Sequence, residues 1–140
     1  MNIRQAQPND VPRLVKMDKK AYGTYGANEK YFRKKLGLQN TKVLVAENDT
    51  SLEGFVVFET LEQDQIPEDF RDLHLKDPMQ GNWAHIIAFT TKTNYRDIVS
   101  DRLLLHAVEE MAKSMGCYTI CVPLSVDHPF ISHNVLSFGN

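Results

Sequence analysis

The sequence predicts an α+β fold: a mixed, mostly antiparallel sheet with flanking helices. Two observations carry this prediction. Strand-like and helix-like segments follow one another in the order β-α-α-β-β-β-α-β-α along 140 residues. In addition, residues 83–124 contain one β-α-β unit, whose helix is long enough to return the chain for a right-handed parallel crossover. The strands outside this unit are expected to pair antiparallel.

Length and composition indicate one globular domain, residues 1–140. Hydrophobic residues make up 42% of the chain and charged residues 24%, which suits a soluble protein with a core of its own. The net charge of −2 argues against general nucleic-acid binding, which needs a basic face. No apolar run approaches the ~20 residues of a membrane span, and the N-terminus has no signal-peptide pattern. We therefore expect a cytoplasmic protein without a nucleic-acid or membrane partner.

The first part of the chain is predicted to form a strand and two helices. Residues 3–6 read as a short strand, and Asp10 follows as the N-cap of a helix. Apolar side chains then recur at helical spacing as far as Tyr22. Asn28 is predicted to cap a second, shorter helix that ends at Gly37.

A hairpin and a long loop are predicted next. Residues 42–47 and 52–61 have strand composition, and a polar turn cluster separates them. The segment 62–81 holds six acidic side chains and is expected to be a loop. It is either a solvated insertion, with a short helix at 67–73, or a lid that offers an acidic wall to a cationic amine.

The last part of the chain contains the parallel unit. Residues 83–91 are predicted to be the central strand, and 103–115 a helix that packs one apolar face on the sheet. A final strand is expected at 117–124, and a short helix from 127 to the end of the chain.

Two cysteines, Cys117 and Cys121, lie on that final strand. At ~3.3 Å per residue they would stand about 13 Å apart on one face, too far for a disulfide. We expect two buried thiols, with a nucleophilic Cys121 as the alternative.

The segment between the central strand and its helix has the layout of an anion site. A strand, a turn and a helix N-terminus in this order aim backbone N–H groups and the helix dipole at one point. Lys92 and Arg96 add positive charge there. Val99 is β-branched, and Asp101 brings its own anion to the helix start. The alternative is that Ser100 and Asp101 serve as a helix cap and a first-turn acid.

The same segment resembles the acyl-CoA-binding motif of the GCN5-related N-acetyltransferase (GNAT) superfamily, R/Q-x-x-G-x-G/A. Arg96 matches the first position, and Tyr95 matches the aromatic residue that often precedes it. Val99 and Asp101 stand at the two glycine positions, so the motif is degenerate. Residues 53–58 resemble the family's third strand, and the order of elements resembles the family fold over nearly the whole chain.

This resemblance implies a single GNAT-like acyltransferase domain, shortened at its C-terminus, with acetyl-CoA or another acyl-CoA as co-substrate. The donor would lie between the fourth and fifth strands, with its pantetheine arm along the fourth strand and its pyrophosphate on the turn. The residues expected to bind it are Phe89, Thr90, Thr91, Arg96, Asp97, Ile98, Val99, Ser100 and Asp101.

Acyl transfer to an amine needs a base, which in the family is often a Glu on the fourth strand. No Glu occurs within residues 79–98, and His85 is the candidate there because histidine titrates near neutrality. A purely structural strand histidine is the alternative reading. Glu59 is the second candidate base. At the position of the family's acidic Tyr the chain has Gly139, which leaves Ser137 or solvent as the proton donor.

Three functions stay open. The first is an N-acyltransferase for a small-molecule or peptide amine. The second is a catalytically inactive domain of the same fold that binds an acyl-CoA or a protein partner, as the lost glycines suggest. The third is a structural protein without a CoA site. No metal is expected, because no acid or cysteine stands at ligand spacing from His106, His128 or His133.

A homodimer is also expected. The family usually adds strands beyond its fourth helix, whereas this chain ends at Asn140. The strand at 117–124 would then be an uncovered sheet edge, which a second copy could pair with directly or cover with residues 127–140.

Overall fold

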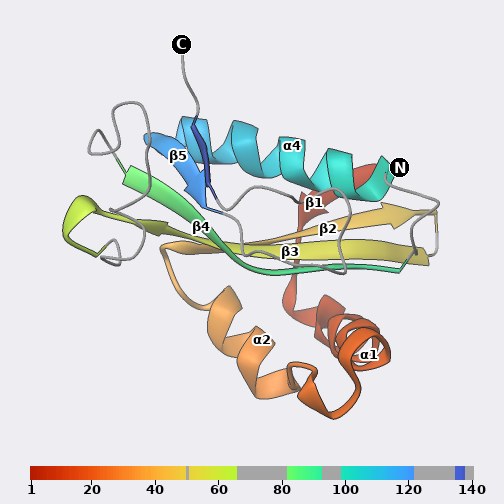
Figure 1. Ribbon diagram of the computed structural model, residues 1–140. Coiled ribbons are helices and arrows are strands. Elements are labelled where there is room, and N and C mark those ends of the chain that lie inside the picture. The colour runs from red at the N-terminus through yellow and green to blue at the C-terminus, as the bar shows by residue number, and fades with distance from the viewer. Residues whose placement is uncertain (50, 66–81, 93–98, 122–134, 138–140) are drawn as a thin grey trace.

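A computed structural model describes residues 1–49, 51–65, 82–92, 99–121 and 135–137. A six-stranded sheet separates two helical layers (Figure 1). The strands are β1 (Asn2–Gln5), β2 (Thr41–Asn48), β3 (Ser51–Leu61), β4 (Asn82–Thr91), β5 (Cys117–Cys121) and β6 (Val135–Ser137). The helices are α1 (Val11–Tyr22), α2 (Glu29–Leu36) and α4 (Val99–Ser114). Helices α1 and α2 lie on one face of the sheet and α4 on the other (Figure 1).

The sheet follows chain order from β1 to β6 and confirms the predicted mixed topology. β1 to β4 are successive antiparallel neighbours, and β5 pairs with β4 in parallel after the crossover through α4. β2 and β3 form the expected hairpin. The parallel pair is the one joined by a helix, as the sequence pattern predicts.

Each face of the sheet buries its own core. Toward α4, alternate residues of β2, β3 and β4 pack against Leu104, Val108 and Ala112. Toward α1 and α2, the opposite set of sheet residues packs against Val11, Leu14 and Phe32. Because successive strand residues point to opposite faces, both sides of the central strands are apolar and the sheet is held between the helices.

The predicted caps are partly confirmed. The Asn28 side chain accepts a hydrogen bond from the Tyr31 N–H at 2.9 Å and begins α2, and Gly37 ends it. Asp10 precedes α1, but its side chain makes no cap hydrogen bond to that helix. Its carboxylate instead accepts bonds from Arg4 at 2.8 and 2.9 Å and from Arg13 at 2.7 Å.

This ion-pair cluster ties the start of α1 to the edge of the sheet. Arg4 also donates to Glu47 at 2.7 Å across the β1–β2 pair. Hydrogen bonding to Arg4 holds the pKa of the buried Asp10 carboxyl well below its usual range. The sequence predicts Asp10 as a helix cap, but in the structure its carboxylate pairs with Arg4 of β1 instead.

The C-terminal prediction is wrong in one respect. Residues 135–137, expected in a helix, form β6, which pairs antiparallel with β5 through Cys121↔Val135, Ile120↔Leu136 and Thr119↔Ser137. β5 is therefore covered within one chain, and the uncovered edge that motivated the homodimer is not present. The segments 66–81 and 122–134, with the expected helices at 67–73 and 127–134, lie outside the described residues.

Both cysteines are free and buried, as expected. Burial raises the pKa of each thiol, Cys117 and Cys121, to about 11. Both thiols are thus protonated near neutral pH, which argues against the nucleophilic alternative. Among the helices that the structure describes, none has the length and apolar character that a membrane crossing requires.

Candidate active site

The two candidate bases lie side by side. In the β3–β4 register Glu59 stands opposite His85, and the His85 Nδ1 atom is 3.1 Å from Glu59 Oε1. The sequence analysis treats these residues as alternatives, and the structure joins them into a pair. Each side chain is 24% exposed, so the pair is packed yet open to solvent. Nδ1 faces the carboxylate, and Nε2 is the second ring nitrogen that can carry a proton.

β4 continues beyond the stretch whose pairing with β5 is described. His85 is paired with Cys121 of β5, and β4 runs on for six residues to Thr91. Residues 122–134, which follow β5, lie outside the described residues. We refer to residues 86–91 as the C-terminal half of β4.

A β-bulge lies directly after the pair. Val57 is opposite Ala88 and Phe58 is opposite Ile86, so Ile87 is the extra residue on β4. A bulge bends the strand and interrupts its ladder, and such irregularities are frequent beside active sites. Here the bulge lies two residues beyond His85, in the C-terminal half of β4.

Side chains at the end of β4 hold the strand in place. Phe89 is buried in the core under α4, and Thr90 is buried on the opposite face. The Thr90 hydroxyl donates to the buried Asp18 carboxylate of α1 at 3.0 Å, and Asp18 also accepts from the Ala27 N–H. The side chains of Phe89 and Thr90 are therefore buried away from any ligand, whereas that of Thr91 is partly exposed.

The start of α4 is where the expected anion site begins. Val99 is 55% exposed, whereas Ser100 and Asp101 are buried. The helix already includes Val99, so Ser100 lies within its first turn and is not its cap. Asp101 lies three residues before Leu104, on the face of α4 that packs against the sheet. Its carboxylate is therefore buried. Arg96, Asp97 and Ile98, with the rest of the turn from residue 93, lie outside the described residues.

A tyrosine near Glu59, and the serine that the sequence suggests as a proton donor, are the last two groups to place. Tyr31 on α2 was not selected from the sequence, where it reads as an ordinary helix residue. Burial, then the charges of Asp18 and Glu59, raise the pKa of the Tyr31 phenol, which keeps it protonated near neutrality. Ser137 lies on β6 opposite Thr119, not in a helix. Within the described residues, no group of three or more His, Cys, Asp or Glu is arranged to hold a metal.

Comparison with solved structures identifies the architecture. A transcriptional regulator from Bacillus halodurans C-125 superposes with a TM-score of 0.69 at 18% identity, over 93% of this chain and 85% of that one. An aminoglycoside acetyltransferase from an uncultured soil metagenomic sample, solved in complex with sisomicin, gives 0.66 at 18% identity, over 92% and 80%. The ribosomal-protein-alanine N-acetyltransferase of Brucella melitensis gives 0.61 at 19% identity, over 87% and 73%.

This chain has the GNAT fold. No protein-family model matches the sequence, and no curated protein matches it either. At these identities the likeness concerns the fold, and the chemistry has to be argued from the site itself. The features that matter for that argument are the His85–Glu59 pair and the bulge after it.

Proposed function

We propose that this GNAT-fold chain is an N-acyltransferase that moves an acetyl or acyl group from acyl-CoA to an amine. The observation that carries the proposal is the His85–Glu59 pair on the adjacent strands β3 and β4, with the β-bulge directly after it. A positioned proton acceptor is what amine acylation requires. His85 is the proposed general base, and Glu59 is a positioning residue that acts through it.

The reaction needs one proton removed and one returned. His85 Nε2 takes the proton of the amine as its nitrogen attacks the thioester carbonyl, and the bond between carbonyl carbon and sulfur then breaks. Glu59 holds the imidazole through Nδ1 and stabilises the imidazolium that forms. The departing thiolate takes a proton from the imidazolium or from water. Ser137, the proton donor that the sequence offered, is a weaker candidate because it belongs to a different strand pair.

The resemblance to the family implies that the donor's pantetheine arm lies along the C-terminal half of β4 and that its phosphates lie at the start of α4. Main-chain binding of the arm's amide groups would tolerate side-chain changes. At the start of α4, by contrast, Val99 and Asp101 replace the glycines that permit close approach. We therefore expect acetyl-CoA to bind weakly, with Arg96 and its neighbours as the phosphate-side residues.

The acceptor is proposed to be a small-molecule or peptide amine. The similar solved structures include an aminoglycoside acetyltransferase and a ribosomal-protein-alanine N-acetyltransferase, which motivates testing both kinds of acceptor. Neither name assigns a substrate to this chain.

The test measures thiol release from acetyl-CoA against pH with a panel of amines that includes aminoglycosides and short peptides. His85→Gln should lower kcat by about 10²-fold or more, the usual scale for loss of a general base. Glu59→Gln should lower kcat by a smaller factor and leave KM for acetyl-CoA unchanged, because the imidazole loses the group that orients it.

The matched control is His106→Gln, since the His106 side chain is 69% exposed on α4, across the sheet from the pair. It should leave kcat unchanged. Full activity of His85→Gln would refute the assigned base, and a Glu59→Gln variant with unchanged kcat, or with an effect on KM alone, would refute the positioning role.

A second function is supported by a different observation. The buried acid Asp101 and the β-branched Val99 at the helix start favour an acyl-CoA-binding or protein-binding domain without catalysis. Calorimetric binding of acetyl-CoA without amine-dependent thiol release would support this function over catalysis.

A further inference from the structure

A cavity separate from the His85–Glu59 pair opens at the far end of β4. It measures about 510 Å³ and lies between α1, the first residues of β3 and the last residues of β4. Its lining residues are Arg13, Lys16, Met17, Lys20, Ala21, Ser51, Leu52, Thr91 and Lys92. Four of these carry a positive charge, and no carboxylate is among them.

The cations differ in how far they are already engaged. Arg13 is bound to Asp10 at 2.7 Å, and the Lys92 Nζ atom donates to the Ser51 hydroxyl at 3.0 Å. Lys16 and Lys20 are exposed, stand one helical turn apart on α1, and have no polar partner in the part of the chain that the structure describes. Two ammonium groups are therefore available to an anion at the cavity mouth.

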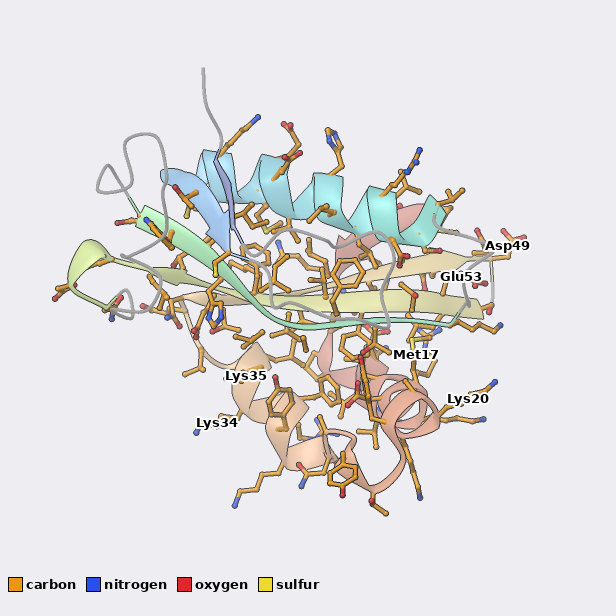
Figure 2. All side chains as sticks on the ribbon, in the orientation of Figure 1. Met17, Lys20, Lys34, Lys35, Asp49 and Glu53 are labelled. Carbon is orange, nitrogen blue, oxygen red and sulfur yellow. The ribbon has the colours of Figure 1, made fainter. Side chains whose placement is uncertain are left out.

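The remaining lining is apolar. Leu52 is buried, and Figure 2 shows Met17 between α1 and the sheet, while Lys20 extends outward from the same helix. Asp49 and Glu53, at the nearby end of the β2–β3 hairpin, do not line the cavity (Figure 2). A cavity lined by both apolar and positively charged side chains suits a molecule with an apolar body and phosphate groups.

The positive charge of the surrounding surface strengthens the attraction of the cavity for anions. Residues 13–42, which form most of the α1–α2 layer, contain nine lysines and arginines against two acids, although the whole chain has a net charge of −2. A layer with one sign of charge raises the local concentration of oppositely charged ligands. This run of charge is visible in the sequence, but only the fold brings it beside Lys92.

We infer that this cavity binds a phosphorylated organic molecule of nucleotide type. Phosphate groups pair with Lys16, Lys20 and Lys92, and the apolar body lies on Met17 and Leu52. Such a group has two sources: either the nucleotide end of an acyl-CoA, which rests on the proposed function, or a separate phosphorylated ligand.

The test is calorimetric titration of the full chain with adenosine 3′,5′-bisphosphate at low salt. The double variant Lys16→Gln/Lys20→Gln should weaken binding by about tenfold or more, since it removes both available ammonium groups. The control Lys19→Gln/Lys30→Gln removes the same charge from exposed positions of α1 and α2 that do not line the cavity, and it should change affinity much less. Circular dichroism checks that both variants are folded.

Acetyl-CoA then distinguishes the two sources. Competition between acetyl-CoA and the bisphosphate, with both weakened by the Lys16→Gln/Lys20→Gln variant, supports the nucleotide end of the donor. Simultaneous binding supports a separate ligand, and bisphosphate binding without acetyl-CoA binding would count against the proposed function while leaving the cavity assigned. Absence of bisphosphate binding, or equal weakening by the control variant, would overturn the inference.

Discussion

Gly54 on β3 lies where even one added methyl group should destabilise the fold. A Cβ atom at this position would lie 2.9 Å from Thr91 Cγ2, 3.0 Å from the Thr90 carbonyl oxygen and 3.2 Å from Leu104 Cδ1. The two side-chain contacts can relax by rotation, but the carbonyl belongs to the paired strand β4 and cannot move without disturbing the ladder. Gly54 thus permits the close approach of β3, β4 and α4.

The expected effect of Gly54→Ala follows from two opposing contributions. Overpacking of this kind costs about 1–3 kcal/mol, whereas replacing Gly by Ala restricts the unfolded chain and returns roughly 0.4–1 kcal/mol. The free energy of unfolding should therefore fall by about 1–2 kcal/mol. With a urea slope of roughly 1–3 kcal/mol per molar, the unfolding midpoint should fall by about 0.5–1 M.

Gly37→Ala is the matched control for this measurement. Its φ of −86° suits any residue, and an added Cβ would meet nothing closer than the Lys34 carbonyl oxygen at 3.6 Å. Only the unfolded-state contribution remains, so its urea midpoint should stay the same or rise slightly. Equal midpoints for the two variants would refute the close-approach argument.

Two further predictions concern the ion-pair cluster and the sheet edge. Asp10→Asn should lower the free energy of unfolding at pH 7 by about 2–3 kcal/mol, because it leaves Arg4 and Arg13 without their buried partner. Because folding lowers the Asp10 pKa, the difference in unfolding free energy between the two chains should be complete above about pH 4 and should shrink below it. A difference in thermal unfolding that stays constant down to about pH 3 would contradict this. Ending the chain after residue 134 removes β6 and exposes the β5 edge at 119–121, so light scattering should show self-association that the full chain lacks. Equal particle sizes for the two chains would argue against β6 as the cover.

Local patterns in the sequence were sufficient for the main elements. The helical spacing of 103–115 predicts α4, the turn cluster between 42–47 and 52–61 predicts the β2–β3 hairpin, and Asn28 predicts the start of α2. Each of these signals depends on side chains only a few positions apart, so the responsible interactions are visible without a fold. The parallel pairing of β4 and β5 is also determined by the sequence, because a helix lies between them.

The failures have a common physical origin. Asp10 has the composition of a helix cap, but Arg4 reaches it from a strand and replaces that role. The three residues of β6 are too few to show a period, and pairing with β5 decides their conformation. In both cases a tertiary partner outweighs a local preference.

The candidate site depended most on tertiary structure. His85 and Glu59 are 26 positions apart, and the β3–β4 register alone makes them neighbours. The sequence could name each as a base, but it could not show the β-bulge at Ile87 directly after the pair, because a bulge depends on the register of the two paired strands. The basic cavity is similar: its cations stand in the sequence of α1, and only docking of that helix beside Thr90 places them next to Lys92.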